Sequence, residues 1–236
     1  MSAAAGETVR DVGVIIVAAG TGSRTGAGEL KQFRWVAGKP MLLHSVQLFQ
    51  ARADVAMVIC VLPKSHAGDP PPWLFQSDVD RLLVCTGGRE RTDSVRNGLD
   101  DLPPEAQYVL VHDGARPLVE PATVDRVISA ARGGTAAIAA LPVIDTIKEV
   151  DADGRIVRTV DRSTLWRAQT PQGFPRAMLE DVYARADRER VIASDDAALC
   201  ERFGFPVTVV RGSELAMKVT EEADFARLDA LAAMRP

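Results

Sequence analysis

Short apolar runs alternate with segments of helical spacing from residue 12 to residue 141, and this alternation constrains the fold more than any other feature. The run at 12–17 contains no regularly spaced polar residue, which is typical of a strand buried on both faces of a parallel sheet. Between such runs, apolar side chains recur at helical spacing, as at Leu42, Val46 and Phe49. We therefore expect strands at 12–19, 55–62, 81–85, 108–111 and 135–141, and helices at 40–52, 92–102 and 121–132.

This order of elements predicts an α/β fold whose mostly parallel, doubly wound sheet carries helices on both faces. The pattern is not repeated later in the chain, so we expect a single domain over residues 1–236. We expect residues 167–236 to be mostly helical, with Thr220 capping the last helix. The elements expected there are helices at 175–188, 195–202 and 221–233 and short strands at 205–210 and 216–220.

Residues 142–166 break the alternation and predict a β-hairpin arm. Two runs of alternating polarity, 144–150 and 155–160, flank Asp151-Ala152-Asp153-Gly154. An Asp-Gly pair between such runs is a strong hairpin signal. Because an isolated hairpin is only marginally stable in water, we expect this arm to pack against a second subunit. The alternative is that the hairpin folds back onto its own sheet.

The composition is that of an ordinary globular protein, and it argues against several classes of partner. The formal net charge is −4, so no overall positive field attracts nucleic acid. No apolar run approaches the length of a membrane span, so we expect no membrane partner. The three cysteines, Cys60, Cys85 and Cys200, lie far apart and form no zinc-binding pattern. Unpaired thiols are typical of a reducing compartment, so we expect a cytoplasmic protein.

A loop of small residues follows the first expected strand, at the end of the strand where open α/β sheets bind ligands. Gly20 and Gly22 allow backbone N–H groups to approach a phosphate, and Arg24 and Lys31 add positive charge beside it. The loop therefore predicts a polyphosphate site, although its spacing matches neither the dinucleotide-binding glycine pattern nor the P-loop pattern. The alternative from these residues alone is a tight turn with two solvated cations.

A second glycine turn follows the third expected strand and should reach the same edge of the sheet. Gly87 and Gly88 precede a helix, where backbone groups can face a ligand, and the Ser94 hydroxyl can hydrogen-bond the edge of a base. A cap of this helix by Thr92 or Asp93 is a compatible alternative.

Asp113 follows the fourth expected strand, close to the predicted phosphate loop. A carboxylate there can hold Mg²⁺, which prefers carboxylate and phosphate oxygens. Arg116 can pair with a phosphate or with Asp113, and the alternative is a purely structural Asp–Arg bridge. Lys218 is flanked by apolar residues near the same edge, so a phosphate role competes with simple exposure of its side chain. His112 has no second His or Cys at metal-ligand spacing, and we expect it to be packed or hydrogen-bonded.

The candidate site combines several cations with one or two carboxylates and lacks an activated nucleophile. The sequence contains no G-x-S-x-G motif, and nothing in it suggests a Cys–His pair. In phosphoryl and nucleotidyl transfer, positioning and charge stabilisation carry most of the catalysis. The residues therefore indicate a reaction of that kind.

Seven short motifs occur in order between residues 12 and 231. They are Ala18-Ala19-Gly20-x-Gly22-x-Arg24 with Lys31-Gln32-Phe33; Gly87-Gly88 with Arg91 and Ser94-Val95; Val111-His112-Asp113-Gly114-Ala115-Arg116-Pro117; Asp145-Thr146-Ile147-Lys148; Thr159-Val160-Asp161-Arg162; Gln169-Thr170-Pro171-Gln172; and Met217-Lys218-Val219-Thr220. Together they resemble the 2-C-methyl-D-erythritol 4-phosphate cytidylyltransferase family of the non-mevalonate isoprenoid pathway.

The resemblance implies a Rossmann-like nucleotidyltransferase fold and a homodimer joined by the β-arms. It implies that CTP and methylerythritol phosphate react, with Mg²⁺, to give the CDP-linked alcohol and pyrophosphate. It assigns Arg24, Lys31 and Lys218 to the triphosphate and the transition state, and it places Asp113 near the ribose and the metal. The full set of CTP-binding residues that it implies is Ala18, Ala19, Gly20, Gly22, Gly88, Ser94, Asp113 and Arg116.

The resemblance further implies that Thr146, Arg162 and Thr170 bind methylerythritol phosphate, with Arg162 reaching into the partner's site. Two other functions stay open at this point. A cytidylyltransferase for ribitol 5-phosphate would share the nucleotide loop, although the motifs around Thr146 and Arg162 favour methylerythritol phosphate. A non-catalytic nucleotide-binding module could lose the charges needed only in the transition state. In this chain those charges are all present, at Arg24, Lys31, Asp113 and Lys218.

Overall fold

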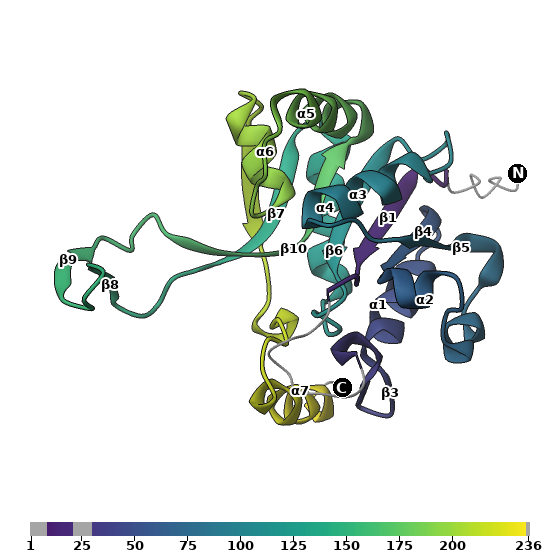
Figure 1. Cartoon of the computed structure of the whole chain (residues 1–236), viewed down its shortest axis with the longest axis horizontal. Coiled ribbons are helices and arrows are strands. Elements are labelled where there is room, and N and C mark those ends of the chain that lie inside the picture. The colour runs from purple at the N-terminus through teal and green to yellow at the C-terminus, as the bar shows by residue number, and fades with distance from the viewer. Residues whose placement is uncertain (1–8, 21–29, 235–236) are drawn as a thin grey trace, which may run out of the picture.

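A seven-stranded, mostly parallel sheet forms the centre of the molecule (Figure 1). The computed structural model describes residues 9–20 and 30–234, and within them the strand order is β11-β7-β10-β6-β1-β4-β5. Only β10 among these strands runs antiparallel to its neighbours, β6 and β7. The strands are β1 (Val12–Val17), β4 (Val55–Leu62), β5 (Leu82–Thr86), β6 (Tyr108–Asp113), β7 (Ala136–Pro142), β10 (Trp166–Pro175) and β11 (Val207–Arg211).

Helices cover both faces of this sheet, which confirms the expected α/β architecture. Alternate residues of β1 point to opposite faces, so Val14 and Ile16 pack in one apolar cluster and Ile15 packs in another. Because both faces are buried, the strand has no polar alternation in its sequence. The first cluster includes residues of α1 (Met41–Gln50) and α4 (Pro121–Arg132), and the second includes residues of α3 (Arg91–Asp100), α5 (Arg176–Glu189) and α6 (Asp196–Arg202).

A third, smaller apolar cluster lies beside the sheet, where α7 (Ala223–Ala233) packs near β2 (Trp35–Val36) and β3 (Lys39–Pro40). Val36 and Met41 contribute from one side, and Phe225 and Leu228 contribute from α7. The remaining short elements are η1 (Lys31–Phe33), α2 (Lys64–Ala67), η2 (Pro72–Gln76), η3 (Val79–Arg81) and η4 (Glu214–Ala216). Across the described residues, every helix is too short or too polar to span a lipid bilayer.

The predicted hairpin arm extends away from the body of the molecule, at the left of Figure 1. Its strands, β8 (Ile147–Val150) and β9 (Ile156–Val160), pair only with each other and are shorter than the expected 144–150 and 155–160. Ile144, Ile156 and Val157 are all at least 60% exposed on this arm. The alternative of a hairpin folded back onto its own sheet is therefore wrong.

The sequence prediction missed β10, because residues 167–236 were expected to be mostly helical. This strand contains Pro171 and Gly173, and both residue types are poor strand formers when judged alone. Pro171 lies within a register irregularity between Ala168 and Gln172 in the pairing with β7, where the loss of a backbone donor is tolerated. Pairing with β6 and β7 on both sides, not local propensity, makes this segment a strand.

Two expectations near the C-terminus were also wrong. No strand forms over 216–220; η4 ends at Ala216, and the Val219 N–H donates to the Ala115 carbonyl instead of joining a sheet. The last helix begins at Ala223, and the Thr220 side chain does not cap it. Instead, Asp224 accepts hydrogen bonds from the Thr220 backbone N–H (2.8 Å) and hydroxyl (2.9 Å).

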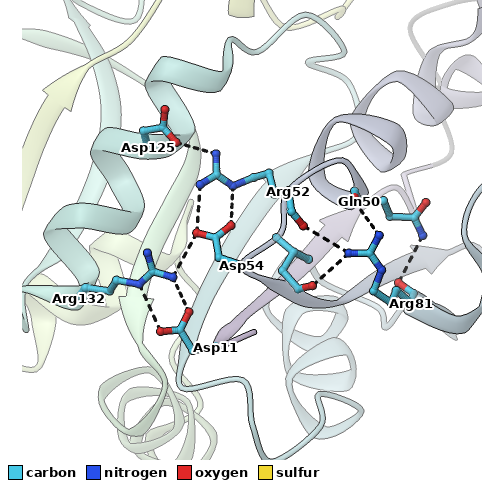
Figure 2. A network of polar contacts seen from close by, with 8 residues as sticks. Asp11, Gln50, Arg52, Asp54, Arg81, Asp125 and Arg132 are labelled. Atoms are coloured by element: carbon cyan, nitrogen blue, oxygen red, sulfur yellow. Dashed lines mark hydrogen bonds and ion pairs between the residues drawn. The ribbon is translucent and has the colours of Figure 1, made fainter. Parts of the chain in front are cut away.

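An ion-pair network lies at the amino-terminal edge of the sheet (Figure 2). The predicted ligand loops lie at the opposite edge. Asp54, which precedes β4, accepts from Arg52 Nε at 3.0 Å and from Arg132 Nη2 at 3.1 Å. Arg132, the last residue of α4, also pairs with Asp11, which precedes β1. Arg52 reaches Asp125 on α4 at 2.6 Å. The network therefore connects the residues that precede β1 and β4 to α4.

We expect Asp54→Asn to lower the free energy of unfolding by about 2 kcal/mol, because two arginines lose a mostly buried carboxylate partner. Burial alone would raise the pKa of Asp54, but Arg52 and Arg132 hold it below its ordinary value. The ion pairs therefore stabilise the fold above the unfolded-state pKa and are lost as the pH falls through the folded-state pKa. Urea unfolding at neutral pH measures the effect.

The matched control is Asp125→Asn, because Asp125 pairs with the same Arg52 but its side chain is 61% exposed. We expect this control to change the free energy of unfolding by less than about 1 kcal/mol. Equal effects of the two substitutions would contradict the buried network as a source of stability.

Candidate active site

A pocket of about 380 Å³ opens at the carboxyl-terminal edge of β1 and β6. It brings together five stretches of the sequence, which are 17–20, 31–32, 88–94, 113–115 and 218–220. Of the predicted site residues, those that line it are Ala18, Ala19, Gly20, Lys31, Gly88, Ser94, Asp113 and Lys218. Gly22 and Arg24 lie outside the described residues.

The loop after β1 is held by the residue that follows Lys31. The buried Gln32 side-chain amide donates to the Ala18 carbonyl at 2.7 Å and to the Gly20 carbonyl at 3.2 Å. Lys31 itself donates from Nζ to the Val219 carbonyl at 2.9 Å. The sequence assigned no individual role to Gln32, whose signal was its place in the Lys31-Gln32-Phe33 motif. Its contacts show that η1 and the small-residue loop form one structural unit.

The glycine turn before α3 packs directly against the loop after β1. A Cβ on Gly87 would lie 2.2 Å from Ala19 Cβ, and a Cβ on Gly88 would lie 2.0 Å from Asp93 Cβ. Neither position has room for a side chain: glycine at 87 permits the close approach of the two loops, and glycine at 88 lets the turn fold tightly against the start of α3. Backbone atoms of both loops consequently line the same pocket.

The Ser94 hydroxyl makes two hydrogen bonds within this turn. It accepts from the Gly88 N–H at 3.1 Å and donates to the Glu90 carbonyl at 3.2 Å. The helix cap is neither Thr92 nor Asp93: Glu90 is the N-cap residue, and Asp93 completes a capping box by accepting from the Glu90 N–H at 3.1 Å.

Asp113 lies at the centre of a cluster of cations. Its Oδ2 lies 2.8 Å from Lys218 Nζ and 3.5 Å from Arg116 Nε, and its Oδ1 lies 3.9 Å from Arg91 Nε. Burial opposes ionisation of the carboxyl, but Lys218, Arg91 and Arg116 together lower the pKa of Asp113 to about 2. Asp113 therefore stays ionised at neutral pH and anchors the Lys218 side chain at the pocket.

Arg91 is a pocket residue to which sequence reasoning gave no individual role. Its Nη2 lies 2.8 Å from Asp196 Oδ2, and the fully buried Asp196 also accepts from the Tyr183 hydroxyl at 2.5 Å. Burial alone would lower the pKa of Arg91, but Asp196 raises it, so the guanidinium stays charged. Its only sequence signal was its place in the glycine-turn motif, because Asp196 is remote along the chain.

Three residues lie behind the pocket, where they contact Asp113 or one another but do not line the pocket: His112, Thr170 and Arg116. The Thr170 hydroxyl accepts from the Asp113 backbone N–H at 3.0 Å and contacts His112 Nδ1 at 3.0 Å. Burial lowers the pKa of His112 to about 4, so the ring is neutral at pH 7, and the expected hydrogen-bonded histidine is confirmed. Arg116 donates from Nη1 to the Ala216 carbonyl at 2.8 Å, which ties the Asp113 loop to the segment before Lys218.

The other two predicted substrate residues lie on the hairpin arm and not in this pocket. Thr146 immediately precedes β8, and Arg162 follows β9 and donates to the Ile144 carbonyl. Within one chain, therefore, the arm residues and the pocket residues are not brought together.

The donor set of the pocket limits the kind of metal it could hold. Among the described residues, no three His, Cys, Asp or Glu side chains converge as a metal cage. Asp113 and Glu90 are the carboxylates of the pocket lining. A single carboxylate together with ligand phosphates suits Mg²⁺, which is rarely enclosed by protein groups alone.

Comparisons with known proteins give one consistent result. A family model described as 2-C-methyl-D-erythritol 4-phosphate cytidylyltransferase matches residues 12–234. An enzyme of that name from Frankia casuarinae is 43% identical, over 94% of this chain and 81% of the relative. Another from Synechococcus elongatus is 42% identical, over 90% of this chain and 92% of the relative. The crystal structure of the enzyme of that name from Thermus thermophilus superposes with a TM-score of 0.80 at 35% identity, covering 95% of this chain and 100% of that one.

We expect Lys218→Met to raise the pKa of Asp113 from about 2 toward its ordinary value, because it removes the closest cation. A carboxyl-carbon NMR titration of the protein without divalent cations measures this shift. In the unsubstituted protein, Asp113 contributes stability above its unfolded-state pKa and loses it only as the pH falls toward 2. Lys148→Met, on the arm, is the control; an unchanged Asp113 titration in Lys218→Met would exclude the ion pair.

Proposed function

The chain belongs to the 2-C-methyl-D-erythritol 4-phosphate cytidylyltransferase family, and on that premise we propose that its pocket transfers CMP from CTP to 2-C-methyl-D-erythritol 4-phosphate. The products are 4-diphosphocytidyl-2-C-methyl-D-erythritol and pyrophosphate, in isoprenoid precursor biosynthesis. One observation carries the assignment of the pocket: Lys31, Lys218 and two backbone loops meet around Asp113 at the carboxyl edge of the sheet. Fixed cations beside close-packed backbone loops suit a nucleoside triphosphate.

The reaction requires charge stabilisation more than proton transfer. The phosphate of the substrate is already an anion at neutral pH, so one of its oxygens attacks the α-phosphorus of CTP without a general base. A new P–O bond forms, the bond to the bridging oxygen breaks, and pyrophosphate leaves with the electron pair. Lys31 and Lys218 lie where they can stabilise the negative charge that builds on the transferred phosphoryl group. Arg24, outside the described residues, is proposed for the same role.

We propose that the two loops hold the nucleoside. Ala18, Ala19 and Gly20 offer backbone to the triphosphate and ribose, and the Gly88 turn, shaped by Ser94, offers backbone to the cytosine. Because Ser94 both accepts and donates within the turn, its main proposed contribution is the geometry of the Gly88 backbone. Arg116 acts through Asp113 and the segment before Lys218.

Asp113 is the proposed protein ligand of Mg²⁺. The fit rests on its ionised carboxylate, whose Oδ2 pairs with Lys218 while Oδ1 lies farther, at 3.9 Å, from Arg91. When bound, the ion supplies positive charge to the triphosphate. The chain's own lysines and loops supply orientation and the remaining charge.

Methylerythritol phosphate is proposed to bind between this pocket and the arm of a second copy of the chain. Ile144, Ile156 and Val157 leave the arm with exposed apolar surface that a partner subunit can cover. In such a homodimer, Thr146 and Arg162 of the partner's arm would meet the substrate, while Thr170 acts from behind the pocket through the Asp113 backbone.

The cytoplasm is the proposed compartment, because all three cysteines are buried free thiols.

Pyrophosphate release in the presence of CTP and Mg²⁺ tests the proposed function. Release should require methylerythritol phosphate and be much slower with ribitol 5-phosphate. Equal or faster turnover of ribitol 5-phosphate would overturn the substrate assignment. Tight binding of CTP with no turnover of either alcohol phosphate would indicate a binding module instead.

We expect Lys31→Ala to lower kcat by about 100-fold, on the order of 3 kcal/mol of barrier, because it removes a cation needed most in the transition state. The KM for CTP should change far less. Steady-state kinetics with both substrates varied provides the measurement, and Lys64→Ala, an exposed lysine on α2, is the matched control. An unchanged kcat in Lys31→Ala would remove Lys31 from the catalytic machinery.

Mixing inactive Lys31→Ala and Arg162→Ala subunits tests whether the site is shared across a dimer. If Arg162 acts in the partner's site, one site of each mixed dimer has both residues, so about a quarter of all sites should regain activity after random exchange. Activity measured as a function of the mixing ratio should peak at equal amounts. A mixture as inactive as its components, despite verified subunit exchange, would show that each site is built within one subunit.

A further inference from the structure

The two proposed catalytic lysines lie on segments that have little regular structure of their own. Lys31 opens η1, a turn of 3 residues, and Lys218 lies in the irregular stretch between η4 and α7. A group that acts on a transition state must be held to within a fraction of an ångström. Tertiary contacts must therefore supply the rigidity that these segments lack.

Residues 218–219 form the point at which these segments meet. Lys218 Nζ pairs with Asp113 at 2.8 Å, and Val219 accepts from Lys31 Nζ at 2.9 Å. The Val219 N–H donates to the Ala115 carbonyl at 2.9 Å. The backbone at 218–219 therefore positions Lys218 directly, and it positions Lys31 through the Val219 carbonyl.

The Asp224 carboxylate holds the backbone that follows this point. Its Oδ2 accepts from the Thr220 N–H at 2.8 Å, the Thr220 hydroxyl at 2.9 Å and the Glu221 N–H at 3.1 Å. Asp224 is 4% exposed, and its other oxygen accepts from Arg227 at 3.0 Å. One buried carboxylate therefore fixes the turn that links Lys218 and Val219 to α7.

The helix that carries Asp224 is in turn docked on the segment that carries Lys31. Glu222 accepts from both terminal nitrogens of Arg34, at 2.5 and 2.8 Å, and the Arg34 guanidinium lies 3.8 Å from the centre of the Phe225 ring. Asp229 accepts from the Ala37 N–H at 2.9 Å. Figure 1 shows α7 beside β3, with an extended segment leading to it from the main sheet.

The geometry points to Asp224 as a positioning residue that, through the turn at 220–221 and the docking of α7, holds Lys218 and Lys31 in register for catalysis. The inference rests on the proposed function, because it presumes that Lys218 acts on the reacting phosphates. Asp224 does not line the pocket, so its effect must pass through the lysines.

A double-mutant cycle on kcat tests this inference. Asp224→Ala in the otherwise unchanged enzyme should lower kcat by roughly 10- to 100-fold, with a smaller change in the KM for CTP, because a misplaced cation fails mainly in the transition state. In the Lys218→Ala background, the same substitution should lower kcat by a clearly smaller factor, since only Lys31 is then left to be displaced. A purely structural role would give the same factor in both backgrounds, and that result would overturn the inference.

The control is Asp78→Ala. Asp78 also caps a turn, accepting from the Asp80 N–H at 3.2 Å and Arg81 Nε at 2.7 Å, but it precedes β5 at the opposite edge of the sheet. We expect its kcat to be unchanged. If Asp224→Ala does not fold, Asp224→Asn takes its place in the cycle. It keeps one acceptor oxygen, so we expect a smaller loss of kcat that is again reduced in the Lys218→Ala background.

The failure of the inference is distinguishable from failure of the proposed function. Full turnover by Lys218→Ala alone would overturn the proposed role of Lys218 and the inference with it. An impaired Lys218→Ala enzyme beside a fully active, folded Asp224→Ala enzyme would overturn the inference alone.

Discussion

The ion pair between Asp113 and Lys218 is the interaction on which the rest of the site depends. It joins the end of a central strand to a segment that enters from the C-terminal part of the chain, at 2.8 Å. Arg116 and Arg91 add positive charge, so Asp113 stays ionised although it is nearly buried. The Asp113 carboxylate can stay charged while buried because the fold holds paired cations beside it.

Around that pair, further contacts place other residues of the pocket lining. Lys31 is tied to Val219, the next residue after Lys218, and Gln32 is tied to the loop after β1. The glycine turn before α3 can approach this loop because Gly87 has no side chain. The pocket is therefore an assembly of loops that are fixed by one another, and the sheet supplies their common edge.

Charge is distributed differently at the two edges of the sheet. At the carboxyl edge, Lys31, Arg91 and Lys218 line a pocket. At the amino edge, Arg52 and Arg132 are engaged by Asp11, Asp54 and Asp125, which leaves a stabilising network with no chemistry assigned to it (Figure 2). Both sets use the same residue types, so residue type alone does not separate a site from a structural network.

The sequence by itself determined most strands of the main sheet, the helices on both faces, the arm and eight of the residues that line the pocket, because hydrophobic period, glycine turns and motifs are local signals. It predicted α4 with both of its observed ends. It could not determine β10, which is interrupted by Pro171 and Gly173 and exists because β6 and β7 pair with it on both sides. Tertiary structure also decided that residues 216–220 form no strand, that Thr170 and Arg116 lie behind the pocket, and that Asp224, Gln32 and Arg91 hold it together. These roles depend on contacts between segments remote in sequence, and no local pattern encodes such contacts.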